Sequence, residues 1–161
     1  MNPQTPLQIK TGLRVAKPAG EVFEAIVDPE KMSNYFISKS SGRMEAGAVL
    51  QWSFPEMAMS FPIRVIAAEP GRQVSFAWST EDGSETIVDM RLKAVDENTT
   101  FVVVTEGEKT LSEASLRWLK SNTEGWANFL ACLKAFLEYG INLRKGAFDP
   151  SQMPDAGSEH A

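Results

Sequence analysis

Between residues 38 and 106 apolar side chains recur at every second position, and this run constrains the fold more than any other feature. Residues 74–79 show the pattern clearly, because large apolar side chains alternate there with small or polar ones. Such alternation predicts β-strands with one buried face. The Pro-Gly pair at 70–71 and the tetrapeptide at 81–84 are turn signals between these segments. Five or six strands joined by short turns predict an antiparallel meander.

The segment before this run predicts one further strand and two short helices. Residues 7–15 alternate in the same way and indicate a half-buried strand. Pro18 suits the first turn of a helix, and apolar residues at helical spacing follow it as far as Val27. Pro29 ends or bends that helix, and residues 31–35 can form a short second one.

After Gly107 the apolar pattern becomes helical. Ser112 can cap a short helix, and the capping-box sequence at residues 121–124 predicts the start of a long helix that reaches Lys145. Apolar side chains cover roughly 200° of this long helix, about twice the ~100° stripe that docking on a core requires. A sheet that curves around the helix can cover both halves. We therefore predict an α+β fold, with a curved antiparallel sheet wrapped around one long C-terminal helix.

Length and composition indicate one soluble domain. We expect residues 1–146 to form the domain and the Pro-, Ser- and Gly-rich residues 147–161 to be a disordered tail. Cys132 is the only cysteine, which suits a reducing cytoplasm, the predicted location. No secretory signal and no run of about 20 apolar residues is visible. Without such an apolar run we expect no membrane span. The net charge of −5 disfavours binding to phosphate backbones, so we expect no nucleic acid partner.

Several kinds of catalytic site lack their residues. His160 is the only histidine and lies in the tail, so a histidine base or a histidine-based metal site has no source. Neither a P-loop nor a GxGxxG segment occurs. The neighbouring carboxylates at 81–82, and those of Glu106 and Glu108, are interpreted as solvated groups at turns or strand ends. We predict no catalytic residue, no cofactor and no metal.

Large, soft apolar side chains are abundant instead. The chain has nine Phe, four Trp and seven Met, and the segment WSFPEMAMSF at residues 52–61 is the densest example. Adaptable thioethers in a loop are typical of the rim of a pocket that accepts varied apolar ligands. The alternative is that these side chains only cover the end of the core.

An ordered set of motifs resembles the START-like (SRPBCC) superfamily, in its branch related to the activator of Hsp90 ATPase. The resemblance begins in the segment KPAGEVFEAIVDPEKMSNYF, with Pro18, Val22, Phe23, Asp28, Pro29, Tyr35 and Phe36. It continues with the pair at 69–70 followed by Val74, Phe76 and Trp78, and it closes with the Gly-Trp pair at 125–126. Tyr35 stands where a Trp is usual, and Gly47-Ala48 stands where a Gly-Gly pair is common.

The resemblance implies a helix-grip fold with a cavity between the sheet and the C-terminal helix. Such cavities bind lipids, polyketides, hormones or other apolar molecules, and some members of the superfamily are cyclases. The Hsp90-activating proteins use a related domain to contact the chaperone, which implies a role in the stress response.

Three functions follow as hypotheses. The leading one is non-catalytic binding of a small hydrophobic molecule between sheet and helix. The second is a protein–protein module, chaperone-linked or homodimeric, that uses the apolar helix surface or the small face of Ala127, Ala131 and Ala135. The third is a cyclase or hydrolase that relies on Tyr35, Asn34 or an inward carboxylate. The candidate ligand-binding residues are Trp52, Phe54, Met57, Met59, Trp78, Met90, Trp118, Trp126, Phe129, Leu133 and Phe136.

Overall fold

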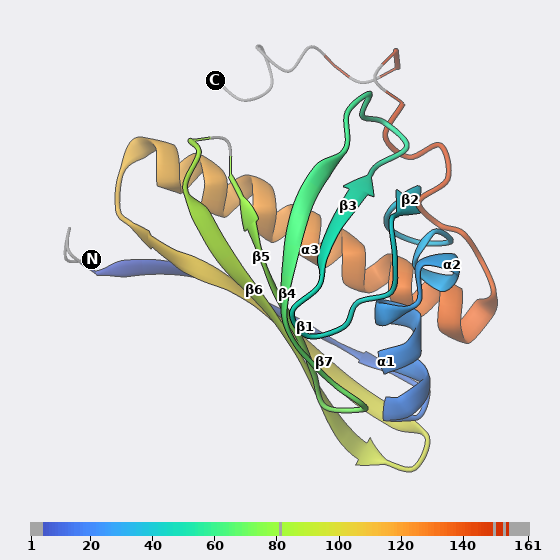
Figure 1. The fold of residues 1–161 in the computed structure, drawn as a ribbon. Coiled ribbons are helices and arrows are strands. Elements are labelled where there is room, and N and C mark those ends of the chain that lie inside the picture. The colour runs from blue at the N-terminus through green and yellow to red at the C-terminus, as the bar shows by residue number, and fades with distance from the viewer. Residues whose placement is uncertain (1–4, 81, 150, 153, 155–161) are drawn as a thin grey trace.

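One antiparallel sheet of seven strands and one long helix form the protein in the computed structural model (Figure 1). The structure describes residues 5–80, 82–149, 151, 152 and 154. The strands are β1 (Pro6–Val15), β2 (Lys39–Ser40), β3 (Val49–Ser53), β4 (Phe61–Glu69), β5 (Gln73–Ser79), β6 (Glu85–Asp96) and β7 (Thr99–Thr110). Their order in the sheet is β1-β7-β6-β5-β4-β3-β2, so consecutive strands from β2 to β7 are neighbours and β1 pairs with β7. The predicted meander is confirmed.

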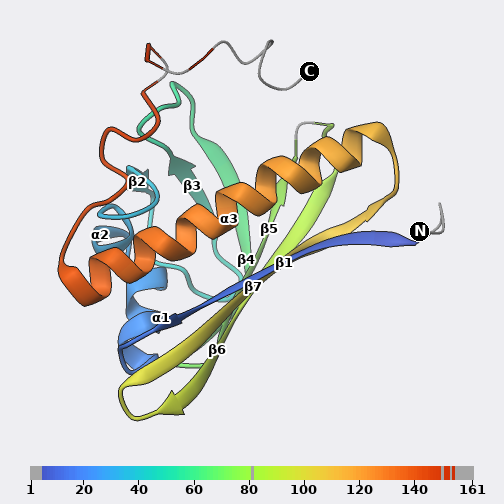
Figure 2. The same ribbon diagram turned by 180° about the vertical axis from the view of Figure 1, so that it is seen from behind.

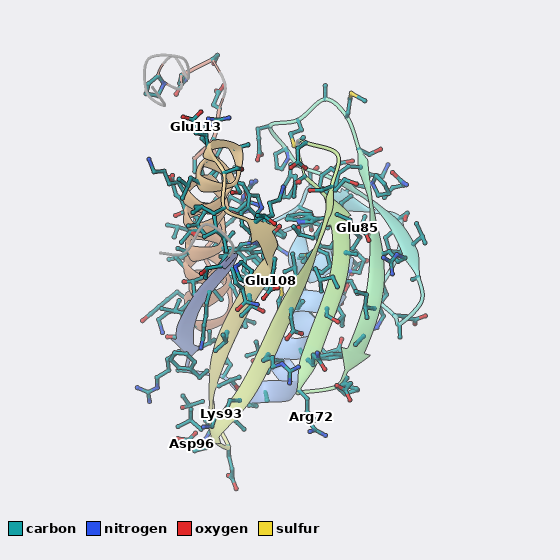
Figure 3. All side chains as sticks on the ribbon, turned by 90° about the vertical axis from the view of Figure 1, so that its left-hand side faces the viewer. Arg72, Glu85, Lys93, Asp96, Glu108 and Glu113 are labelled. Atoms are coloured by element: carbon teal, nitrogen blue, oxygen red, sulfur yellow. The ribbon has the colours of Figure 1, made fainter. Side chains whose placement is uncertain are left out.

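The helices are α1 (Ala19–Val27), α2 (Pro29–Met32) and α3 (Glu113–Tyr139). Figure 2 shows α3 crossing one face of the sheet diagonally, with α1 and α2 beside its C-terminal half. This arrangement is the predicted α+β helix-grip fold. Figure 3 shows the opposite ends of the strands, with Lys93 and Asp96 at one end and Glu85 at the other.

The alternation in the sequence decides which face of each strand is buried. In β6, Val88 and Met90 are fully buried between the sheet and the elements that cover it, whereas Ile87 and Arg91 are exposed on the other face. The apolar residues of α1, from Val22 to Val27, are buried against the same core. Each Å² of apolar surface that this sheet–helix arrangement removes from water stabilises it by about 25 cal/mol.

The long helix differs from the prediction at both ends. It begins at Glu113, because a capping box forms at Ser112, and it continues without a break to Tyr139. The Ser112 hydroxyl accepts a hydrogen bond from the Ser115 N–H at 3.0 Å, and the Ser115 hydroxyl accepts one from the Ser112 N–H at 2.7 Å. The predicted helix start at 121–124 is therefore wrong. These residues lie inside α3, where the Thr123 hydroxyl donates to the carbonyl of Leu119 at 2.5 Å.

The helix also ends earlier than Lys145. Gly140 adopts a left-handed conformation with φ of 67°, and its N–H donates to the carbonyl of Phe136 at 3.0 Å. Glycine reaches this conformation without steric cost, so the chain leaves the helix here. Residues 141–149 consequently run beside the core as turns, which places Arg144 and Phe148 where a helix would not.

Two earlier predictions fall partly or wholly on residues that lack a description. The predicted tail is described only at residues 147–149, 151, 152 and 154, and His160 and Glu81 lie outside the described residues.

The second short helix begins two residues earlier than expected, because Asp28 caps it by accepting a hydrogen bond from the Glu30 N–H at 2.9 Å.

Candidate functional site

Aromatic side chains from the sheet, from α3, and from the segments that follow α2 and β3 meet in one cluster, which we call the aromatic cluster. It contains Phe36, Trp52, Phe54, Phe61, Phe76, Trp78, Trp126 and Phe129. The ring centroids of Phe36 and Phe129 are 4.8 Å apart, and those of Trp52 and Phe76 are 5.2 Å apart. Edge-to-face pairs at these distances stabilise a core beyond their area of contact. The space between sheet and helix is therefore filled with rings at this point.

The cluster brings together five of the predicted ligand-binding residues. These are Trp52, Phe54, Trp78, Trp126 and Phe129. Met90 and Leu133 are fully buried in the core nearby. Phe136 is half-buried and stacks on Tyr35 with ring centroids 5.8 Å apart.

The predicted rim residues come from two different places in the fold. Met57 and Met59 are 50% and 76% exposed in the loop between β3 and β4. Trp118 lies near the start of α3, with the Lys109 ammonium 5.4 Å from its ring centroid. Two of these residues thus share one loop, whereas Trp118 belongs to α3.

Glu106 is a buried carboxylate in contact with the aromatic cluster. Its side chain has no exposed surface, and each of its oxygens accepts two hydrogen bonds. Oε1 accepts from Trp126 Nε1 at 2.8 Å and from Asn122 Nδ2 at 3.1 Å. Oε2 accepts from Trp78 Nε1 at 3.0 Å and from Thr86 Oγ1 at 2.6 Å. The interpretation of Glu106 as a solvated strand-end group is therefore wrong.

The position of Glu106 in β7 explains its burial. Val102, Val104 and Glu106 share the face of β7 that packs toward the core. Because the four donors come from β5, β6 and two successive turns of α3, the carboxylate links the helix to the sheet. Hydrogen bonds compensate its removal from water, as a buried charge requires.

A pocket of about 340 Å³ lies at the C-terminal end of α3. Three chain segments line it: residues 33–37 after α2, the β3–β4 loop, and the turns that follow α3. Figure 1 shows the β3–β4 loop and the segment after α3 at the same end of the molecule. The lining residues are Ser33, Tyr35, Phe36, Ile37, Pro55, Glu56, Asn142, Arg144, Lys145, Gly146, Phe148 and Asp149.

Phe36 belongs both to the pocket and to the aromatic cluster. It lines the pocket, and its ring centroid lies 5.0 Å from that of Phe54 and 5.7 Å from that of Trp126. None of the predicted ligand-binding residues lines the pocket directly. Phe36 therefore contacts both the open space and three of the predicted residues, Phe54, Trp126 and Phe129.

Arg144 forms the charged wall of the pocket. Its guanidinium makes two parallel hydrogen bonds to the Glu56 carboxylate, at 2.6 Å and 3.1 Å. The guanidinium carbon lies 5.2 Å from the ring centroid of Phe54 and 5.0 Å from that of Phe148. The side chains of Arg144 and Glu56 are only 14% and 23% exposed. Sequence reasoning missed Arg144, because the site exists only once Gly140 has ended the helix.

Tyr35 and Asn34, the residues considered for catalysis, already have hydrogen-bond partners. The Tyr35 hydroxyl donates to the carbonyl of Ala25 at 2.7 Å, and the Asn34 amide donates to the carbonyl of Glu30 at 2.8 Å. Tyr35 is fully buried, and this burial raises the pKa of its phenol well above the ordinary range.

We expect the phenol of Tyr35 to stay protonated at pH values where a free tyrosine ionises. An unfolded chain releases this proton near pH 10, whereas the folded chain retains it because its pKa is raised. Stability should therefore fall as the pH rises above about 10 and toward the folded pKa. In a Tyr139→Phe variant Tyr35 is the one remaining tyrosine, so the ultraviolet absorbance of phenolate reports on it alone. Phenolate that forms near pH 10 while circular dichroism still shows a folded protein would contradict this expectation.

No group of three or more His, Cys, Asp or Glu side chains that could hold a metal ion occurs among the described residues. No helix in the described part of the chain is long and apolar enough to cross a membrane.

Comparison with known proteins identifies the family. The family model for activator of Hsp90 ATPase homolog 1-like proteins matches residues 16–138. The structure is similar to that of protein SSP2350 from Staphylococcus saprophyticus, with 30% identity, a TM-score of 0.74, and coverage of 86% of this chain and 96% of that one. It is also similar to DynU16, described as a putative protein in the dynemicin biosynthetic locus, with 26% identity and a TM-score of 0.73.

The DynU16 comparison covers 84% of this chain and 48% of the DynU16 chain, so the chain spans about half the length of that relative. The Aha1 dimer from Colwellia psychrerythraea shares the fold at 19% identity and a TM-score of 0.70, with 83% and 98% of the two chains covered. No curated protein matches the chain in sequence. The family model covers most of the domain, and the chain therefore belongs to the family of activator of Hsp90 ATPase homolog 1-like proteins.

Proposed function

We propose that this protein binds a small apolar molecule, without transforming it, in the pocket beside Phe36. The observation that carries the proposal is a pocket of about 340 Å³ that ends on the aromatic cluster. This volume lies within the range of about 300–1,000 Å³ that small-molecule sites occupy. The lining combines apolar side chains such as Phe36, Ile37 and Phe148 with a small number of polar groups, as ligand sites do.

The pocket and the predicted ligand-binding residues can act as one site. Phe36 packs on Phe54, Trp126 and Phe129 with its ring and faces the pocket beyond them. A change of its rotamer would extend the pocket toward the cluster, so a larger ligand would contact Trp126 and Phe129. In this proposal the aromatic cluster forms the inner wall of the site, and Phe36 is the side chain of that wall that changes its rotamer.

Binding without catalysis agrees with the groups available. The Tyr35 hydroxyl donates a hydrogen bond to a backbone carbonyl, and Glu106 is fully hydrogen-bonded within the core. The relative DynU16 is described as a protein of the dynemicin biosynthetic locus, which supports a small molecule as the ligand. We place the protein in the cytoplasm on the basis of its single cysteine.

Calorimetric titration with 2-naphthalenemethanol, a neutral aromatic alcohol, tests the proposal. We expect saturable binding to the natural chain and loss of binding in a Ser33→Trp variant, whose indole would fill the pocket. A Ser79→Trp variant carries the same exposed indole on β5, outside the pocket lining, and should bind normally. Absence of binding by the natural chain, or equal binding by Ser33→Trp, would contradict the proposal.

We propose a protein contact as the second candidate function, in the form of a homodimer or a chaperone complex. Exposed apolar side chains near the pocket favour it: Met59 is 76% exposed, and Ile141 and Leu143 are each 53% exposed. Light scattering of the purified protein tests the homodimer, and a pull-down with purified Hsp90 tests the chaperone complex. A monomer that does not bind the chaperone would remove this candidate.

A further inference from the structure

The contacts of Arg144 orient its guanidinium so that it can bind a planar anion. Its guanidinium carbon lies over the rings of both Phe54 and Phe148, 5.2 Å and 5.0 Å from their centroids. These rings fix the plane of the guanidinium and keep its side chain at 14% exposure. A partly desolvated guanidinium binds a carboxylate more strongly than one in free solution does.

The anion that the Arg144 guanidinium binds in this structure is a side chain of the protein itself, the carboxylate of Glu56. Both oxygens of Glu56 face the guanidinium, at 2.6 Å and 3.1 Å, which is the two-point arrangement that a carboxylate and an arginine prefer. Glu56 lies in the loop between β3 and β4 and not in a strand, so no ladder of backbone hydrogen bonds fixes its position. A carboxylate on a ligand would present the same shape and charge as the carboxylate of Glu56.

The charges that line the pocket favour such an exchange. The lining contains two cations, Arg144 and Lys145, and two anions, Glu56 and Asp149. Asp149 accepts hydrogen bonds from the backbone and the hydroxyl of Ser151, at 2.9 Å and 2.7 Å, so it is engaged outside the Arg144 pair. When the Glu56 carboxylate turns away, two cations face one anion, and the pocket gains a net positive charge.

We propose that the natural ligand is a small apolar molecule with a carboxylate, which replaces the carboxylate of Glu56 on Arg144. This inference rests on the proposed function and specifies its ligand class. The apolar part of the ligand lies against Phe36 and Ile37, and Glu56 acts as a built-in competitor for the anion-binding group. A weakly binding ligand without a carboxylate does not displace Glu56.

Three probes with the same ring system separate the contributions. These are 2-naphthoate, 2-naphthalenemethanol and 2-naphthylmethylammonium, which carry a negative, a neutral and a positive group. We expect 2-naphthoate to bind most tightly and the ammonium compound least tightly. In a Glu56→Gln variant the affinity for 2-naphthoate should rise about tenfold, because the competitor is gone, and that for the alcohol should change little.

An Arg144→Gln variant should bind 2-naphthoate no better than the alcohol. The pair Arg64–Glu85 provides matched controls, because its 2.8 Å ion pair is exposed on the sheet and is absent from the pocket lining. Arg64→Gln and Glu85→Gln should leave all three affinities unchanged. Equal binding of the three probes by the natural chain, with no gain in Glu56→Gln, would overturn the carboxylate inference and leave the apolar pocket intact. Absence of binding for every probe would overturn the proposed function itself.

Discussion

Replacement of Glu106 by alanine should lower the free energy of unfolding by about 3–5 kcal/mol, because four uncharged donors lose the acceptor that they share. The carboxylate accepts hydrogen bonds from two indole groups, a hydroxyl and an amide, so alanine leaves all four donors without this acceptor. Each buried donor left without a partner costs about 1–3 kcal/mol. The space left by the side chain adds a smaller cost.

The Glu106→Gln variant separates shape from hydrogen bonding. Glutamine keeps the size of the side chain, but its NH₂ group would face two donors in place of an acceptor oxygen. We expect a loss of about 2–3 kcal/mol, measured by urea unfolding. Glu108→Gln, two residues along β7 and exposed, is the matched control and should change stability by less than about 0.5 kcal/mol. Equal unfolding midpoints for the Glu106→Gln and Glu108→Gln variants would show that the network does not hold the helix to the sheet.

Replacement of Phe36 by alanine should have two opposite effects. The free energy of unfolding should fall by about 3–5 kcal/mol, because the ring is packed among Phe54, Trp126 and Phe129. The space that the ring leaves would join the pocket to the aromatic cluster and enlarge the site. We therefore expect the affinity for a bulkier neutral aromatic compound to rise severalfold, because apolar cavities of this kind bind such molecules.

Urea unfolding of the Phe36→Ala variant measures the loss of stability. Calorimetric titration of the same variant with an alcohol of 2-phenylnaphthalene measures the gain in affinity. Phe101→Ala is the control, since Phe101 is 39% exposed and lies outside the pocket lining and the aromatic cluster. It should leave ligand affinity unchanged. A Phe36→Ala protein that loses stability without any gain in affinity would indicate that Phe36 is a core residue only.

The strands were predictable because one face of each is apolar and the turns between them carry strong signals. The same reasoning could have found Glu106, which shares the inward face of β7 with Val102 and Val104. The charge of Glu106 favoured the prediction of a solvated position. The structure shows that four hydrogen bonds replace the water lost on burial of the carboxylate, donated by Trp78, Thr86, Asn122 and Trp126. Such long-range donors are not visible in the spacing of residues along one strand.

The helix boundaries and the pocket illustrate a different limit. Ser, Asn and Thr at residues 121–123 have the composition of a cap, but tertiary contacts of Asn122 and Trp126 with Glu106 stabilise the helix through this segment. The pocket depends on segments that follow three separate elements, α2, β3 and α3. The sequence could predict the aromatic side chains between sheet and helix, whereas the open space beside them depends on where Gly140 turns the chain.

The central claim, that the pocket beside Phe36 is the ligand site, is tested most directly by NMR. Two-dimensional ¹H–¹⁵N spectra recorded during titration with 2-naphthalenemethanol should show the largest shifts at the backbone amides of residues 33–37, 56 and 142–148, and at the indole of Trp126. A second hollow, on the outer face of the sheet, is lined by Gln8, Gln73, Asp89 and Arg91 and serves as an internal reference. Shifts confined to that outer hollow, or no shifts at saturating ligand, would contradict the account.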